Sequence, residues 1–341
     1  MPKTIRNVYY KYLTFDNLMK AHKKSQNGKT TRKNIVKFNL KQEEYIMWLY
    51  ERLMTKTYKH GGYTSFYVTE PKLRKVEASA YIDRVVHRWV VDSFLMDTFV
   101  PTFIDTSYAC LRNRGMHRAA LDVQKGMQKC KKKYGEYYIL KMDIAKYFAN
   151  INKEKLCQII KKKIKDPDVL WLLNEIIYSK KEEVGIPIGN LTSQIFANVY
   201  YNEADQYIKH NLKVRYYYRY MDDSIILMKN KEELKETKRK IEKFITEELY
   251  LAFNSKTNIF KSKQGVNFCG YKINEYRMKL RTKGKKRIKK NIKKLKLKIK
   301  NGEISSKDAK KHLCGHFGYL KYADAYNFTN KYFENEKNEQ G

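Results

Sequence analysis

The sequence predicts an α+β protein in which an antiparallel sheet is flanked by helices. Short runs of aromatic and apolar residues at 137–142, 214–220 and 224–228 have the composition of strands, and the last two are spaced as a β-hairpin. Apolar residues recur at helical spacing before, between and after these runs. This mixture of elements predicts the α+β class.

The composition points to a nucleic-acid partner. The chain has 341 residues and is 42% hydrophobic, enough for one large domain or two to three intimate subdomains. Lys and Arg total 72 against 36 Asp and Glu, a formal charge of +36. Such a charge repels itself unless a polyanion neutralises part of it, whereas solubility alone does not need a twofold basic excess.

Cysteine usage and hydropathy predict a cytoplasmic protein. The five cysteines are scattered without paired short spacing, which indicates neither a disulfide framework nor a zinc site. The N-terminus has no apolar segment of the kind found in export signals, and no apolar run is long enough to span a bilayer. We therefore expect a protein that is neither exported nor inserted in a membrane.

The first hundred residues are expected to be mostly helical. Residues 1–60 are polar and basic, with helical spacing of apolar residues at 12–19 and 45–53. Gly61-Gly62 interrupts this pattern before a strand-like segment at 65–69. A helix is then predicted from 82 to 100, because Pro101 ends its apolar pattern.

Further helices are predicted in the second half of the chain. Two lie within 154–179, one runs from 193 to 209 after a glycine-containing loop at 185–189, and one follows the hairpin. Residues 281–300 contain twelve Lys or Arg, with Ile288, Ile292, Leu295 and Ile299 at helical spacing. One face of this helix is expected to pack, and the other to face phosphate.

Three aspartates predict a magnesium site. Asp143 ends one strand-like run, and Asp222-Asp223 lie at the turn of the hairpin. Turns favour aspartate for local hydrogen bonds, but adjacent acids repel each other unless a cation compensates. If the strands are neighbours, Asp143 reaches the paired acids from the same edge of the sheet, and hard oxygen ligands suit Mg²⁺. Two Mg²⁺ ions held there would support nucleotidyl transfer.

Four segments in this order resemble the motifs of reverse transcriptases. They are Asp143-Ile-Ala-Lys-Tyr147-Phe148, Gly185-Ile-Pro-Ile-Gly189-Asn-Leu-Thr-Ser193-Gln194, Tyr220-Met-Asp-Asp223 and Phe268-Cys-Gly-Tyr271. The resemblance implies a right-hand polymerase fold of fingers, palm and thumb, with an antiparallel palm sheet and a helical thumb. The bounds it implies are 1–65 for an N-terminal helical extension, 66–136 for the fingers with part of 150–190, 137–275 for the palm and 276–341 for the basic thumb.

The resemblance also implies the roles of individual residues. Asp143 and Asp222 would bind the metal ions directly with Ile144, Asp223 would support them, and Lys256 would donate a proton to pyrophosphate. Phe148 would be a steric gate against the ribose 2′-hydroxyl. The other nucleotide contacts would be Lys72, Arg74, Tyr147, Ile188, Gly189, Ser193 and Gln194. Phe268, Cys269, Gly270 and Tyr271 would form the primer grip, and Arg112, Arg114, Lys289, Lys290 and Lys293 would contact the nucleic-acid backbone.

The loop before the nucleotide-pocket helix indicates a subclass. Ile188-Gly189 and Ser193-Gln194, together with Ser107-Tyr108-Ala109-Cys110 and Gly115-Met-His117-Arg118-Ala119, resemble reverse transcriptases of diversity-generating retroelements. That resemblance implies copying of a template-repeat RNA into cDNA, misincorporation opposite template adenines, mutagenic retrohoming, and a small basic accessory protein. RNA template, RNA/DNA hybrid and dNTPs are the other expected partners.

Other readings of the sequence remain. A retron or phage-defence reverse transcriptase shares the core motifs and differs in the loop. A group II intron enzyme is disfavoured, because no maturase or endonuclease extension follows the expected thumb. A catalytically idle RNA-binding module would need only the charge, and it gives no reason for Asp143, Asp222 and Asp223 to occur together.

Overall fold

The computed structural model describes residues 4–69 and 73–334, which form two compact units. Unit 1 is built from Met1–Asp105, Ile144–Lys213 and Lys240–Phe253, and unit 2 from Thr106–Asp143, Val214–Arg239 and Asn254–Gly341. Each unit therefore combines segments that are distant in sequence. Helix α11 (Lys231–Leu249) contributes residues to both.

Unit 1 is mainly helical, as the apolar spacing of its segments predicts. Its helices pack through buried apolar side chains such as Leu18, Leu49, Val86 and Phe196. The helices are α1 (Tyr9–Tyr12), α2 (Phe15–Gln26), α3 (Lys33–Asn39), α4 (Gln42–Met54), α5 (Tyr81–Val90), α6 (Met96–Phe99), α8 (Lys153–Lys161), α9 (Pro167–Ile177) and α10 (Leu191–Gln206). An antiparallel hairpin of β1 (Tyr63–Val68) and β2 (Arg74–Ser79) completes the unit.

Two of the predicted helices differ from the structure in detail. The single helix expected from 82 to 100 begins as α5, widens into a π-helical turn at Val91–Leu95 and continues as α6. The helix expected from 193 to 209 begins at Leu191 and ends in a second π-helical turn, Tyr207–Asn211. Apolar spacing does not reveal such turns, because a single widened turn changes the helical periodicity over only a few residues.

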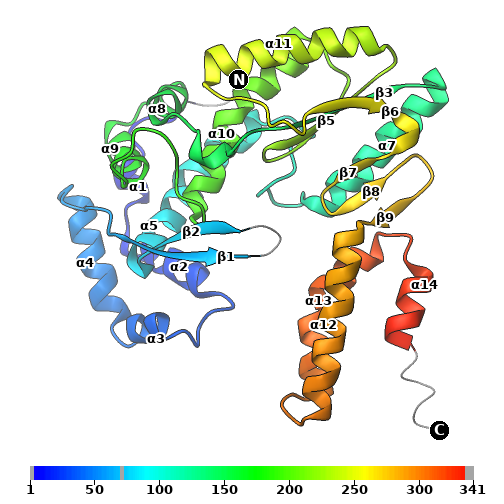
Figure 1. The fold of residues 1–341 in the computed structure, drawn as a ribbon. Helices are drawn as coiled ribbons and strands as arrows, with labels where there is room; N and C mark the ends of the chain where they lie inside the picture. Colours follow the sequence, from blue (N-terminus) through cyan, green and yellow to red (C-terminus); the bar gives the residue numbers. More distant parts are fainter. Residues whose placement is uncertain (1–3, 70–72, 335–341) are drawn as a thin grey trace. The chain divides into compact units, whose positions relative to one another are not determined.

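A four-stranded antiparallel sheet is the framework of unit 2 (Figure 1). The strand order is β4-β5-β3-β6, and the strands are β3 (Tyr138–Asp143), β4 (Tyr216–Tyr220), β5 (Asp223–Met228) and β6 (Asn258–Lys261). The predicted hairpin is confirmed as β4 and β5, with one correction. Asp223 pairs with Tyr220 as the first residue of β5, so only Met221 and Asp222 form the turn.

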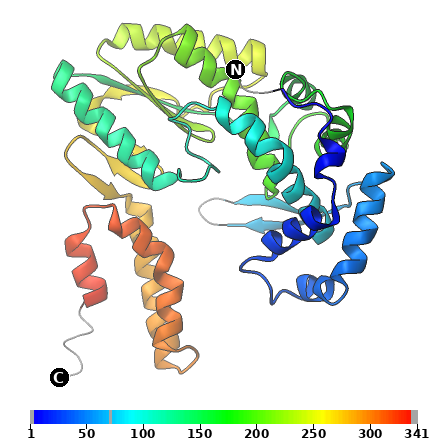
Figure 2. The same ribbon diagram turned by 180° about the vertical axis from the view of Figure 1, so that it is seen from behind.

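Helix α7 and a second sheet cover one face of the four-stranded sheet. Helix α7 (Met116–Tyr134) contacts β4, β5 and β8, and Figure 2 shows it from behind. The second sheet contains β7 (Val266–Phe268), β8 (Tyr271–Ile273) and β9 (Met278–Leu280). One buried cluster joins these elements and includes Val123, Ile139, Ile225 and Phe268.

The C-terminal part of unit 2 is helical. The basic segment 281–300 forms α12 (Thr282–Lys300) as predicted, followed by α13 (Ser306–Lys321) and α14 (Tyr326–Thr329). Ile288 and Ile292 of α12 are buried in the same cluster as the sheets. In the part of the chain that the structure describes, no helix combines the length and the apolar character needed to cross a membrane.

Candidate active site

The strand register brings two of the three predicted acids together. Strands β3 and β5 are antiparallel neighbours, and Asp143 lies directly opposite Asp223. Side chains of directly opposed residues point to the same face of a sheet, with Cβ atoms about 4.5–5.5 Å apart. Asp222 precedes Asp223 in the turn. The expectation that Asp143 meets the hairpin acids at one edge of the sheet is confirmed at the level of the backbone.

A buried arginine supports the turn that carries Asp222. Met221 has a φ of 58°, in the left-handed region that is costly for residues other than glycine. Arg219, which is 0% exposed, donates from Nη1 to the carbonyl oxygen of Met221 at 3.0 Å and from Nη2 to Oγ of Ser107 at 3.0 Å. The backbone of Arg219 also bonds to Thr106 and Tyr108. The segment before α7 therefore holds the strained turn in place.

The loop that contains Lys256 is hydrogen-bonded to the backbone of Asp143. The amide of Asn254 donates to the carbonyl oxygen of Asp143 at 2.7 Å, and Oγ1 of Thr257 accepts from the amide of Asp143 at 3.2 Å. Lys256 is exposed, and its amide donates to Oδ1 of Asn254 at 3.1 Å. The structure thus places Lys256 in a fixed loop beside the backbone of a predicted catalytic acid.

The acids share one electrostatic environment that includes a lysine. Burial raises the pKa of Asp223 to about 6. The positive charge of Lys141 opposes this rise, and repulsion from Asp143 and Asp222 adds to it. Nζ of Lys141 lies 2.8 Å from both carboxylate oxygens of Asp223. Asp143 and Asp222 both add negative charge around Asp223, and a group of neighbouring carboxylates attracts cations.

The oxygen ligands that these acids offer fit Mg²⁺. The carboxylate groups of the three aspartates do not converge on one position in this structure. Asp143 and Asp222 would supply hard oxygen ligands from two adjacent segments of unit 2, and Ile144 follows Asp143 directly. Among the residues that the structure describes, no three His, Cys, Asp or Glu side chains converge on a metal position. The bonds of Asp223 to Lys141 account for the orientation of one of these carboxylates.

The segment predicted as a primer grip is a tight hairpin that contacts the C-terminal helices. Cys269 and Gly270 connect β7 to β8 with φ values of 48° and 89°. A Cβ atom on Gly270 would lie 2.7 Å from the ring of Tyr319 in α13, so only glycine fits there. The hydroxyl of Tyr271 donates to the carbonyl oxygen of Tyr319 at 3.2 Å and bonds to Nδ1 of His117 at 2.7 Å. The hairpin is thereby linked to α7 and α13.

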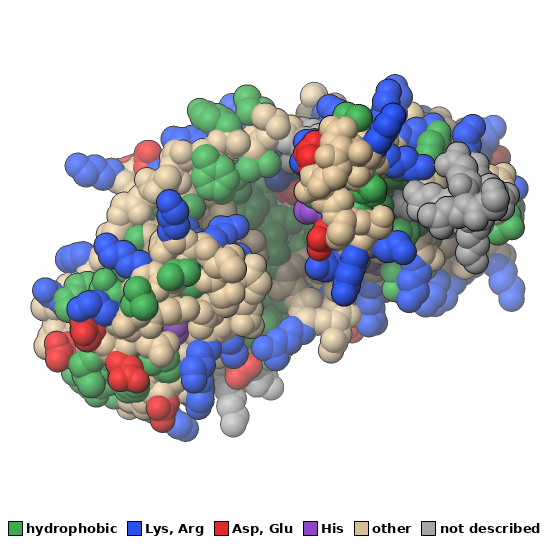
Figure 3. Space-filling model, turned by 90° about the horizontal axis from the view of Figure 1, so that it is seen from below, with side chains coloured by type: hydrophobic (Ala, Val, Ile, Leu, Met, Phe, Trp, Pro, Cys, Tyr) green, Lys and Arg blue, Asp and Glu red, His purple; other side chains and the backbone are tan. Residues whose placement is uncertain are grey.

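The residues predicted to contact the nucleic-acid backbone lie on basic surface of unit 2. Lys289, Lys290 and Lys293 are exposed on α12, opposite the buried Ile288 and Ile292. Arg112 is exposed, and Nη1 of Arg114 donates to the carbonyl oxygen of Ser107 at 2.7 Å. Figure 3 shows many Lys and Arg side chains at the surface, with fewer Asp and Glu. This distribution suits a polyanion.

Unit 1 holds the residues predicted to contact the nucleotide. Phe148 is half-buried, and its carbonyl oxygen accepts from the amide of Ile186 at 2.9 Å. The hydroxyl of Tyr147 donates to the carbonyl oxygen of Ala197 in α10. Ser193 and Gln194 lie in the first turn of α10. Lys72 lies outside the described residues, and Arg74 is exposed at the start of β2.

The loop with Ile188 and Gly189 is bonded to the β1–β2 hairpin. The carbonyl oxygen of Ile188 accepts from the amide of Glu77 at 2.9 Å. Gly189 has a φ of 121°, and a Cβ atom there would lie 2.8 Å from Cγ1 of Val76. Ile188 and Gly189 of the predicted nucleotide pocket therefore lie directly against β2, the strand that carries Arg74.

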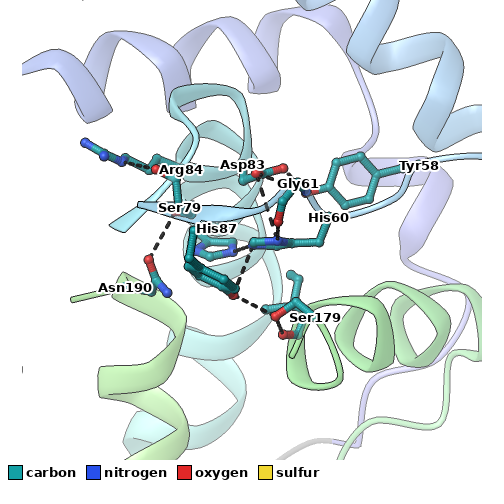
Figure 4. A network of polar contacts seen from close by, with 11 residues as sticks. Tyr58, His60, Gly61, Ser79, Asp83, Arg84, His87, Ser179 and Asn190 are labelled. Carbon is teal, nitrogen blue, oxygen red and sulfur yellow. Dashed lines mark hydrogen bonds and ion pairs between the residues drawn. The ribbon is translucent and has the colours of Figure 1, made fainter. Parts of the chain in front are cut away.

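A buried polar network anchors the base of this hairpin (Figure 4). Oγ of Ser79 donates to Oδ1 of Asn190 at 3.1 Å, where the loop enters α10. Nε2 of His87 lies 3.1 Å from Nε2 of His60, and burial lowers the pKa of His87 to about 3. The carboxylate of Asp83 accepts from the hydroxyl of Tyr58 at 2.7 Å and from the amide of Gly61 at 3.2 Å.

Sequence reasoning missed Lys141, Arg219 and this network. Lys141 alternates with the buried Leu140 and Met142 on a strand that leads to Asp143, which places its side chain on the face of the acids. Arg219 interrupts a run of tyrosines immediately before the turn. Either pattern could have drawn attention to a basic residue near the acids, but neither indicates which distant residues it contacts. The polar network depends on contacts between segments that are distant in the chain, so no local pattern in the sequence indicates it.

Comparison with solved structures identifies the class of fold. Apo telomerase from Candida tropicalis superposes with a TM-score of 0.50 at 14% sequence identity, covering 65% of this chain and 49% of that one. This likeness, with the antiparallel sheets and surrounding helices, confirms the right-hand polymerase fold predicted from the sequence.

Comparison of sequences identifies the family. The model of the reverse transcriptase (RNA-dependent DNA polymerase) family matches residues 69–273, more than half of the chain, and the chain belongs to this family. Protein YkfC of Escherichia coli is 26% identical over 145 residues, covering 40% of this chain and 38% of YkfC. The group II intron-encoded protein LtrA of Lactococcus lactis is 24% identical over 177 residues, covering 49% of this chain and 28% of LtrA. The chain thus spans less than two fifths of the length of these two relatives.

Proposed function

We propose that this protein is an RNA-directed DNA polymerase that extends a primer by nucleotidyl transfer. The observation that carries the proposal is the β3–β5 register, which sets Asp143 opposite Asp223 beside the turn with Asp222. Family membership supports the same activity. Asp143 and Asp222, with the carbonyl of Ile144, would hold two Mg²⁺ ions, and Asp223 would support them. When bound, these ions would lower the pKa of the primer hydroxyl and stabilise negative charge on the phosphates.

The protein side chains would position the reactants. In the proposed reaction, the primer 3′ oxygen would form a bond to the α-phosphorus as the bond to the pyrophosphate oxygen breaks, and the hydroxyl proton would pass to water. Phe268 to Tyr271 would hold the primer end, and Lys256 would give a proton to the departing pyrophosphate. Arg74 and Lys72 would bind the triphosphate, with Tyr147, Ser193 and Gln194 in the nucleotide pocket. Phe148 would exclude the ribose 2′-hydroxyl.

Primer extension tests this activity. Purified protein should extend a DNA primer on an RNA template with dNTPs and Mg²⁺, and Asp222→Ala should abolish extension while leaving RNA affinity unchanged. Phe148→Ala should admit ribonucleotides. Salt-sensitive RNA binding without any extension would instead identify an RNA-binding module without catalysis.

We further propose that the enzyme belongs to a diversity-generating retroelement and copies a template-repeat RNA in the cytoplasm, assisted by a small basic accessory protein. The support is the loop signature at Ile188-Gly189 and Ser193-Gln194, in which the carbonyl oxygen of Ile188 accepts a hydrogen bond from Glu77 of β2. Altered packing of these residues near the templating base would loosen discrimination between correct and incorrect pairs. Mutagenic retrohoming would follow from errors at template adenines.

Sequencing of the cDNA product separates the subclasses. Errors concentrated opposite template adenines would support the retroelement assignment. Errors spread evenly over the four template bases would favour a retron or phage-defence enzyme, or an intron-encoded one of the kind found among the sequence relatives.

A further inference from the structure

Lys141 makes three short contacts that join a predicted catalytic acid to the β7–β8 hairpin. Its Nζ donates to Oδ1 and Oδ2 of Asp223, both at 2.8 Å, and to the carbonyl oxygen of Asn267 at 2.7 Å. An ammonium group has three hydrogens, and each of them has a partner here. The side chains of Lys141 and Asp223 are 22% and 30% exposed, so water screens this ion pair less than a surface pair.

The position of Lys141 in the sheet explains why it can make these contacts. Lys141 pairs with Ile225 and Asp143 with Asp223, so Lys141 reaches Asp223 diagonally across adjacent strands on one face. Asn267 lies in the middle of β7, next to Phe268, whose ring centroid is 5.9 Å from the ammonium. The same cation therefore contacts the acid cluster and the strand that leads into the Phe268–Tyr271 turn.

We propose that Lys141 is a positioning residue that clamps Asp223 to the β7–β8 hairpin. It would keep the distance and orientation between this acid and the primer-holding turn constant. This inference rests on the proposed polymerase function and adds a residue to it. Lys141 also places a positive charge beside one of three neighbouring carboxylates, that of Asp223. Asp223 would then act through its bonds to Lys141 rather than as a metal ligand.

Two kinds of effect follow from losing the clamp. Without the ammonium group, Asp223 and the hairpin are no longer tied together, and misplacement of reacting groups by about 1 Å costs up to about 100-fold in rate. Loss of a positive charge beside the acids also removes a repulsion on divalent cations, so less Mg²⁺ should be needed. A purely structural role would instead lower stability and leave the Mg²⁺ requirement unchanged.

The test is steady-state primer extension by the full chain on an RNA template, with Mg²⁺ titrated, for wild type and three variants. Lys141→Met should lower kcat by about 10-fold or more, raise the KM for primer–template, and lower the Mg²⁺ concentration for half-activation by about 3-fold or more. Lys141→Arg keeps the charge and should keep the Mg²⁺ requirement of wild type. Lys229→Met, which removes an exposed charge directly after β5, is the matched control and should resemble wild type.

A double-mutant cycle with Asp223→Asn locates the effect. In the Asp223→Asn background, Lys141→Met should change kcat by less than about 3-fold, because the clamp is already broken. Equal kinetics and equal Mg²⁺ requirements for Lys141→Met and Lys229→Met would overturn the inference. Should Lys141→Met fail to fold, a loss of the wild-type Mg²⁺ requirement in Lys141→Arg would overturn it. A wild-type protein that does not extend primers would instead overturn the proposed function, and the inference with it.

Discussion

Substitution of Gly126 tests whether α7 packs on the sheet that carries the acids. Gly126 lies inside α7, and a Cβ atom there would lie 2.1 Å from the hydroxyl oxygen of Tyr218 and 2.8 Å from Cζ of its ring. Tyr218 is 7% exposed in β4, where it pairs with Ile225. Because the ring is enclosed on the sheet face, Gly126→Ala must displace it or the helix.

Two opposing effects determine how much Gly126→Ala changes the free energy of unfolding. Replacing glycine by alanine inside a helix stabilises it by about 1 kcal/mol. Overpacking a filled core costs about 1–3 kcal/mol, and this contact is far shorter than a non-bonded approach allows. We expect a net loss of about 1–2 kcal/mol in the free energy of unfolding, which lowers the melting temperature by roughly 2–8 °C.

Thermal and urea unfolding measure this loss against a matched control. Gly315 lies inside α13, and a Cβ atom there would have no neighbour within 4 Å. Gly315→Ala should therefore gain up to about 1 kcal/mol from helix propensity alone. The packing described for α7 would be refuted if Gly126→Ala were as stable as Gly315→Ala.

Three further predictions concern binding, the loop and pH. Replacing Lys289, Lys290 and Lys293 by alanine should weaken template–primer binding and reduce the slope of log affinity against log salt concentration by up to about 2–3 in fluorescence anisotropy titrations; an unchanged slope would place the duplex elsewhere. Gly189→Ala should cost about 1–2 kcal/mol of stability because of its positive φ and the contact with Val76, and calorimetry showing no loss would contradict this close contact. In metal-free protein, folding raises the pKa of Asp223 from 3.8 to about 6, so the folded state keeps a proton that the unfolded chain has lost. Denaturant unfolding should show wild type losing stability relative to Asp223→Asn as the pH rises from about 4 to 6. A difference in the free energy of unfolding that stays constant over this range would argue against the buried environment of Asp223.

The sequence predicted those parts of the molecule that local patterns determine. Short runs of aromatic and apolar residues located the strand before Asp143 and the two strands of the hairpin on either side of Asp222. The basic amphipathic pattern located α12. Ordered motifs then led to the family and to the right-hand fold.

Contacts between distant segments were not predictable in the same way. Lys141 is 82 residues from Asp223 and 126 from Asn267, so its role depends on strand register that no single segment encodes. Arg219 reaches Ser107 across 112 residues. The third strand of the second sheet and the π-helical turns also depend on how the surrounding side chains pack.

Counting bound divalent ions tests the central claim, that Asp143 and Asp222 together hold the catalytic metals. Mn²⁺ titration followed by electron paramagnetic resonance can be performed on the protein bound to template–primer and a non-hydrolysable dNTP. Wild type should bind two tight ions, and the Asp143→Asn, Asp222→Asn double variant should bind fewer with equal affinity for template–primer. Equal numbers of tight ions in both proteins would contradict the account.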